Sequence, residues 1–113
     1  MTLEFKEQKQ GAVVVFRPEG ALTGADAEVF TARFTATIGS AMGKCVLDAT
    51  AIPYVDSLGL EALMDISDSL SDLGRSLKIS HVNDTLRETF DLTKTAASFE
   101  YYDDINAAVR SYL

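Results

Sequence analysis

One stretch of the sequence, residues 46–60, decides how the rest of the chain is interpreted: VLDATAIPYVDSLGL. A mainly apolar run begins just before it at Lys44 and stops at Asp48, which is typical of a short central strand. A loop follows, and Asp56 or Ser57 can cap a helix through a side-chain oxygen. The stretch therefore predicts a strand, a crossing loop and a helix start, with Asp48 bracing the loop.

The clearest helix is predicted from Ser57 to Leu73, with Gly74 as its stop signal. Its apolar residues recur at helical spacing and form one stripe: Leu60, Leu63, Ile66, Leu70 and Leu73. A second stripe on another face is acidic: Glu61, Asp65, Asp68 and Asp72. An acidic stripe is typical of a solvated face or of one complementary to a basic partner, with a divalent-cation site as the alternative.

Two strands and a helix are predicted upstream. Leu3 and Phe5 alternate with charged residues, which indicates a half-buried strand, and a turn at Gly11 leads into the β-branched run 12–16. The helix that follows carries its apolar residues at a spacing of four: Phe30, Phe34 and Ile38. Thr23 and Asp26 form its capping-box-like start, and Gly39 and Gly43 break it.

Two further strand–helix units are predicted downstream. Leu77 and Ile79 mark a strand, Asn83 or Asp84 caps a short helix, and residues 99–102 form the last strand before a final helix that starts at Asp103 and Asp104. That helix buries one face: Ile105, Ala108, Val109 and Tyr112. The order β-β-α-β-α-β-α-β-α predicts an α/β domain over residues 1–113, with a mixed, mostly parallel sheet of four to five strands and about four helices.

Composition excludes several classes of function. Ten Lys and Arg stand against seventeen Asp and Glu, a net charge of -7, and there is no basic run. This balance argues against nucleic acid and anionic membranes as partners. No apolar run is long enough to insert into a membrane, and no signal-peptide core is present, so a cytoplasmic location is expected. One cysteine, Cys45, and one histidine, His81, predict no metal site and no cofactor.

The motif in the opening stretch resembles the signature of STAS domains, the fold of bacterial anti-sigma factor antagonists. The matching positions are Asp48, Thr50, Asp56, Ser57, Gly59 and Leu60, and upstream Gly20-x-Leu22 resembles the family's Gly-x-Leu-Asp. The element order is also that of the family, so the resemblance extends over nearly the whole chain. It implies a single STAS domain that works by binding other proteins.

The resemblance also implies a mechanism, partner switching. In the family, the unphosphorylated antagonist binds an anti-sigma factor, usually a serine kinase of the histidine-kinase-like ATPase type, and a sigma factor is released. The kinase then phosphorylates a serine at a helix N-terminus, which changes the charge and shape of the interface. The antagonist itself does no catalysis.

The sequence departs from the family pattern at two positions. The usual phosphate acceptor is replaced by Leu58, which leaves Ser57 as the candidate for phosphorylation, and Thr23 stands where the family commonly has Asp. From periodicity, Leu58 either packs into the core or stays exposed as an anchor for a partner. Because leucine cannot be phosphorylated, the exposed alternative implies a domain that binds constitutively or is regulated elsewhere.

The resemblance places the partner-binding residues at the start of the helix from Ser57 and in the loop before the preceding helix. They are Asp56, Ser57, Leu58, Gly59, Leu60 and Glu61, with Thr23, Gly24, Ala25 and Asp26. An alternative keeps the fold and changes the role, to an accessory subunit of a lipid-transport ABC system or a stress-signalling scaffold. An enzyme is the third possibility, which would need Asp48, Asp56 and Ser57 to act together without a nearby histidine or lysine base.

Overall fold

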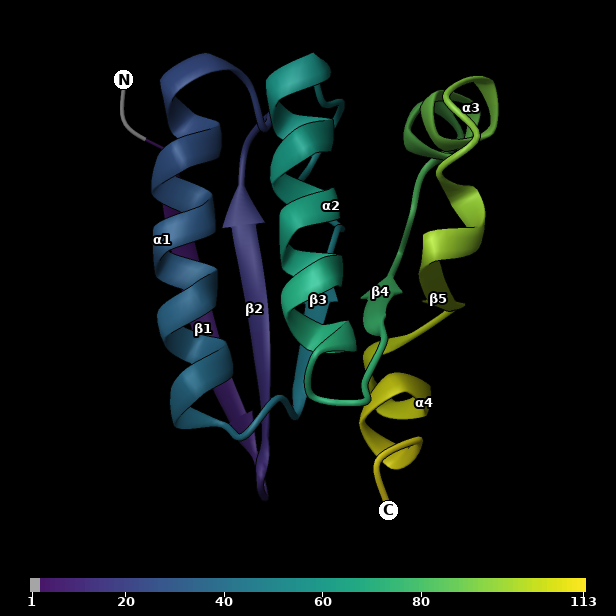
Figure 1. Cartoon of the computed structure of the whole chain (residues 1–113). Coiled ribbons are helices and arrows are strands. Elements are labelled where there is room, and N and C mark those ends of the chain that lie inside the picture. Colours follow the sequence, from purple (N-terminus) through teal and green to yellow (C-terminus); the bar gives the residue numbers. More distant parts are fainter. Residues whose placement is uncertain (1–2) are drawn as a thin grey trace.

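The sheet has five strands that lie in chain order across it, as Figure 1 shows. The computed structural model describes residues 3–113, so Met1 and Thr2 of the predicted domain lie outside the described residues. The strands are β1 (Glu4–Gln10), β2 (Val13–Glu19), β3 (Cys45–Asp48), β4 (Leu77–Ser80) and β5 (Phe99–Tyr102). β1 pairs with β2 in antiparallel fashion, and the other neighbours are parallel. The predicted mixed, mostly parallel sheet is confirmed.

The helices alternate with the parallel strands, which confirms the predicted order. Within the described residues they are α1 (Gly24–Ser40), α2 (Ser57–Ser71), α3 (Asp84–Leu92) and α4 (Ile105–Arg110), with a short 3-10 turn, η1 (Ala96–Ser98). In Figure 1, α1 and α2 lie side by side on one face of the sheet, with their first turns at the same end. That end is the edge where β2 and β3 finish, because each helix follows one of these parallel strands.

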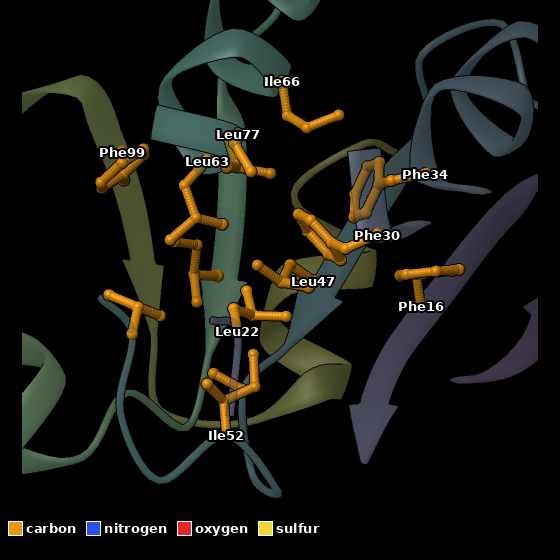
Figure 2. Close-up of a cluster of buried hydrophobic side chains, with 14 of the residues drawn as sticks. Phe16, Leu22, Phe30, Phe34, Leu47, Ile52, Leu63, Ile66, Leu77 and Phe99 are labelled. Carbon is orange, nitrogen blue, oxygen red and sulfur yellow. The ribbon is translucent and has the colours of Figure 1, made fainter. Parts of the chain in front are cut away.

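The main core lies between the sheet and helices α1, α2 and α3. Figure 2 shows Phe30 and Phe34 of α1 facing Phe16 of β2, and ring centroids of Phe16 and Phe34 are 4.9 Å apart, edge to face. The buried stripe of α2 adds Leu63, Ile66 and Leu70 to the same cluster. Burial of large side chains of this kind stabilises a domain by about 1.5–3 kcal/mol each, so this layer fixes where α1 and α2 sit.

A smaller cluster on the opposite face explains why the strand β2 is buried on both sides. Val13 and Val15 of β2 and Val46 of β3 pack with Ala108 of α4. The Tyr112 hydroxyl donates a hydrogen bond of 2.7 Å to the carbonyl of Cys45, which fastens the end of the chain to β3. Of the predicted buried face of the last helix, Ala108 is buried, whereas Ile105 and Val109 are partly buried against this cluster. Tyr112 is also partly buried there, but it lies beyond the end of α4.

Two predictions about helix ends are wrong. Helix α1 continues through Gly39 to Ser40, and the chain turns at Gly43, whose φ of 79° suits glycine. Helix α2 ends at Ser71, before Leu73, which is 55% exposed and does not belong to the buried stripe. The cause is the tight turn through Gly74 (φ 72°), which directs the chain toward β4 and takes Leu73 off the helix face.

Candidate functional site

The Asp56 side chain caps α2 and also holds the start of α1. Its Oδ1 accepts a hydrogen bond from Gly59 N (2.8 Å), and its Oδ2 accepts one from Gly24 N (3.1 Å). The hydrogen bond from Gly59 N lowers the pKa of Asp56 below its ordinary value of 3.8. Partial desolvation raises this pKa, and the hydrogen bond from Gly24 N lowers it further. Of the two residues predicted as alternatives for the N-cap, Asp56 is the one observed, and Ser57 is the first helical residue.

The predicted capping role of Thr23 is wrong. Thr23 occupies the N-cap position of α1 but makes no side-chain capping hydrogen bond there. Its backbone carbonyl accepts from Asp26 N (3.0 Å), and Asp56 supplies the carboxylate that Gly24 N needs. An acceptor 32 positions away in sequence cannot be found by searching for a local capping box.

Gly59 allows α2 to pack directly against the segment before α1. A β-carbon at this position would lie 2.0 Å from the carbonyl oxygen of Leu22, which is backbone and cannot move aside cheaply. Leu22 also forms a parallel bridge with Val55, and its carbonyl accepts from Asp56 N (3.2 Å). The two loops that carry the predicted partner-binding residues are therefore joined through their backbones.

The loop between β3 and α2 is held at its start and near its middle. Asp48 is buried, and its Oδ1 accepts from Thr50 N (3.0 Å) and from the Thr50 hydroxyl, so it braces the loop as predicted. His81 Nδ1 lies 3.5 Å from the same oxygen. Asn83 donates through Nδ2 to the carbonyl of Ile52 (2.9 Å), while its Oδ1 caps α3. The loop thus presents α2 on a fixed framework.

The side chains of the predicted site divide between support and surface. Gly59 is buried and Leu60 is half-buried against the core, whereas Ala25, Ser57, Leu58 and Glu61 are exposed. Leu58 is 50% exposed in the first turn of α2, so the exposed orientation is the one observed. The remaining members are partly buried: Thr23, Gly24, Asp26 and Asp56.

A groove runs between α1 and α2 beside Leu58. It has a volume of about 470 Å³ and is lined by Gly24, Ala27, Glu28, Thr31, Ala32, Leu58, Glu61, Ala62 and Asp65. The groove extends the predicted surface along α1, which the sequence interpretation left out. Three of its lining residues are acidic.

Tyr54 is a surface residue that sequence reasoning missed. It is 51% exposed in the loop that leads into α2, and its backbone carbonyl accepts from Leu22 N (3.3 Å). The sequence did contain a signal for it: an aromatic residue beside Pro53, four positions before Leu58, in a predicted loop between a strand and a helix. Exposed aromatic side chains on a fixed backbone are enriched in the energetically important positions of interfaces.

The chain belongs to the STAS family. A model of the STAS domain matches residues 4–108, and the five-stranded sheet with α1 and α2 on one face agrees with it. No curated protein sequence matches the chain significantly. None of the described helices is long and apolar enough to cross a membrane. Over residues 3–113, no group of three or more His, Cys, Asp or Glu side chains is placed to hold a metal ion.

Solved structures show the same fold at low sequence identity. A provisionally assigned anti-sigma factor antagonist of Thermotoga maritima is 21% identical, with a TM-score of 0.86 over 95% of this chain and 92% of that one. The anti-sigma factor antagonist SpoIIAA of Bacillus, also known in a phosphorylated form, is 16% identical, with a TM-score of 0.70 over 96% of both chains. The mouse anion transporter Slc26a9 is 18% identical, with a TM-score of 0.74 over 92% of this chain and 18% of that one.

Proposed function

We propose that this chain is an anti-sigma factor antagonist that binds an anti-sigma factor through the start of α2 and the adjoining start of α1. The observation that carries the proposal is Leu58, an apolar side chain half exposed to solvent in the first turn of α2. Ser57 and Glu61 flank it on the surface. Structural neighbours that are named anti-sigma factor antagonists support the choice of partner.

The framework beneath Leu58 favours binding. Asp56 fixes the first turns of both helices, and Asn83 holds the loop that precedes α2. An anchor on a backbone that is already ordered loses little conformational entropy when a partner covers it. Covering Leu58 also removes exposed apolar surface from water, at about 25 cal/mol per Å². Leu58 can therefore serve as an apolar anchor for a partner.

The proposed mechanism is partner switching without catalysis by this chain. The antagonist occupies the anti-sigma factor, a serine kinase of the histidine-kinase-like ATPase type, and the sigma factor is released in the cytoplasm. Nothing in this role requires a metal or cofactor. The acidic surface around Leu58, with Glu61 and Asp65 exposed on α2, suits a partner with basic groups.

Ser57 is the proposed site of phosphorylation. It is exposed, it is the first residue of α2, and its side chain is not the helix cap, because Asp56 fills that role. A phosphate there would add up to two negative charges beside Asp56 and Glu61, changing the charge of the binding surface. Incubation with the kinase and ATP, followed by peptide mass spectrometry, should place one phosphate on Ser57 and none on a Ser57→Ala variant. Absence of phosphate from the wild type would contradict the proposal that Ser57 is phosphorylated.

A second candidate function follows from Leu58 standing where the family carries its usual acceptor. A constitutive binding surface also suits an accessory subunit of a lipid-transport ABC system or a scaffold built with larger STAS proteins. This candidate predicts stable co-purification with an ATPase and a permease, or with larger STAS proteins, irrespective of added ATP. The antagonist predicts instead a complex with an anti-sigma factor.

The test is release of a sigma factor. Each anti-sigma factor of the source genome is loaded with its fluorescently labelled sigma factor, and the chain is added while anisotropy is followed. Wild type should displace one sigma factor, Leu58→Asp should not, and Leu73→Asp should behave as wild type. Leu73 is the matched control because it is 55% exposed at the opposite end of α2. Displacement by Leu58→Asp at the wild-type concentration, or by none of the proteins, would reject the proposal.

A further inference from the structure

We propose that the groove between α1 and α2 receives an amphipathic helix of the partner, with small apolar residues on its inner face and Lys or Arg along its edges. The proposal rests on the proposed function for the identity of the partner, and on the groove itself for the partner's chemistry. It extends the contact surface from the first turns of the two helices to just over two turns along each.

The floor of the groove is made of small side chains. Ala27 and Ala62 are buried at its base, Ala32 lies on the α1 side, and Gly24 lies at the end where Asp56 joins the two helices. Small residues allow the backbone of a third element to approach closely, as in the packing of one helix into the groove of another. Leu58 stands at the same end and gives the occupant an apolar contact.

The rim of the groove is acidic on both sides. Glu28 of α1 and Glu61 and Asp65 of α2 are exposed, and none of the described residues that line the groove is basic. Glu61 and Asp65 are four positions apart, so their carboxylates lie one helical turn apart on the same face. Charge complementarity therefore selects a basic occupant.

The shape of the groove favours a helix over an extended strand. Figure 1 shows α1 and α2 side by side and running in the same direction. The groove between them is lined by residues of both helices, from Gly24 to Ala32 of α1 and from Leu58 to Asp65 of α2. Beyond the first turns, the described backbone groups along the walls are paired within the two helices, so they offer no ladder for a strand. An amphipathic helix instead needs only side-chain contacts, with Lys or Arg spaced one turn apart to meet Glu61 and Asp65.

The first experiment compares two pairs of neutral substitutions on the same helix. Glu61→Gln with Asp65→Asn removes two charges from the groove, whereas Asp68→Asn with Asp72→Asn removes two charges outside it, from the last turn of α2 and its C-cap. Affinity for the anti-sigma factor is measured at about 50 and 500 mM salt. The groove pair should weaken binding at least about fivefold at low salt and flatten the salt dependence, with the control pair close to wild type. Equal effects of the two pairs would overturn the proposal.

The second experiment needs no anti-sigma factor and separates the two proposals. A stapled peptide roughly four turns long, with Ala and Leu on one face and Arg along both edges, is titrated into labelled protein. Amide signals of Ala27, Thr31 and Ala62 should shift, less so for the groove pair, and not with a peptide carrying Glu in place of Arg. Shifts confined to other surfaces, or none, would overturn the groove proposal even where the anti-sigma factor binds. Shifts at the groove without any anti-sigma factor binding would reject the proposed function and keep the inference.

Discussion

Asp56 and Gly24 are 32 positions apart in sequence, yet Asp56 Oδ2 accepts a hydrogen bond from Gly24 N at 3.1 Å. The other oxygen of the same carboxylate accepts from Gly59 N at 2.8 Å. One side chain therefore joins the first turns of α1 and α2, where the N–H groups of both helices lack partners of their own. The buried core positions the two helices as a whole, and this carboxylate joins their first turns at the end of the groove where Gly24 lies.

Replacing Asp56 should loosen both helix starts. Asp56→Ala removes the acceptors for Gly24 N and Gly59 N and should lower the melting temperature, whereas Asp56→Asn keeps one amide oxygen for a cap and should lower it less. Thermal unfolding followed by circular dichroism measures both. Hydrogen exchange should speed up at the first turns of α1 and α2 together. Faster exchange in α2 only would contradict the double role.

The lowered pKa of Asp56 predicts a stability change in acid. Since the folded state favours the ionised form, the contribution is fully present above the ordinary value of 3.8 and is lost as the pH falls through the lower folded pKa. Wild type and Asp56→Asn should therefore converge in stability as the pH drops below 3.8. Denaturant unfolding at a series of pH values measures this difference, and a difference that stays constant with pH would contradict the cause given.

Gly59 should tolerate no side chain. Gly59→Ala places a β-carbon 2.0 Å from the carbonyl oxygen of Leu22, so α2 must shift away, at a cost of about 1–3 kcal/mol or more. Gly39→Ala is the matched control, because that glycine lies in α1 with open space around the added carbon, and it should gain about 0.5–1 kcal/mol. Urea unfolding compares the two. Equal stability of both variants would show that the approach of α2 to Leu22 is looser than described.

The main elements of the fold could be predicted because their signals are local. Leu63, Ile66 and Leu70 recur at the helical period and are buried, and Asn83 and Asp104 cap their helices as residues of that type do. Leu73 shares the same spacing but lies beyond the end of α2. The spacing of apolar residues does not mark where a helix ends, and here the chain turns at Gly74.

The support of the site could not be predicted because it is formed by residues distant in sequence. Thr23 has the right residue type for a cap, but the acceptor for Gly24 N comes from Asp56. The orientation of Leu58 stayed open for a related reason. Leu58 is exposed because Gly59 and Ala62 occupy the buried positions of the first turns of α2. The spacing of apolar residues in the sequence does not show which of these positions face the core.

Cys45 should be inert in the folded protein. Burial raises the pKa of its thiol to about 12, and no part of the residue is exposed in β3. A thiol reagent such as DTNB should therefore react at the rate of unfolding. A Met42→Cys variant in a Cys45→Ala background is the control, because position 42 is 79% exposed and should be labelled at once. Rapid labelling of wild-type Cys45 in native buffer would contradict the buried placement.

The most direct test of the central claim is the affinity of Leu58 variants for an anti-sigma factor. Calorimetric titration of wild type, Leu58→Asp and Leu73→Asp isolates the contact. Leu58 is exposed in the first turn of α2 and Leu73 is exposed just beyond its last turn, so both substitutions should change stability by less than about 0.5 kcal/mol. The account predicts that Leu58→Asp binds at least about tenfold more weakly, or about 1.4 kcal/mol, and that Leu73→Asp binds as wild type does. Unchanged affinity of Leu58→Asp, or an equal loss in both variants, would contradict the claim that the start of α2 is the binding surface.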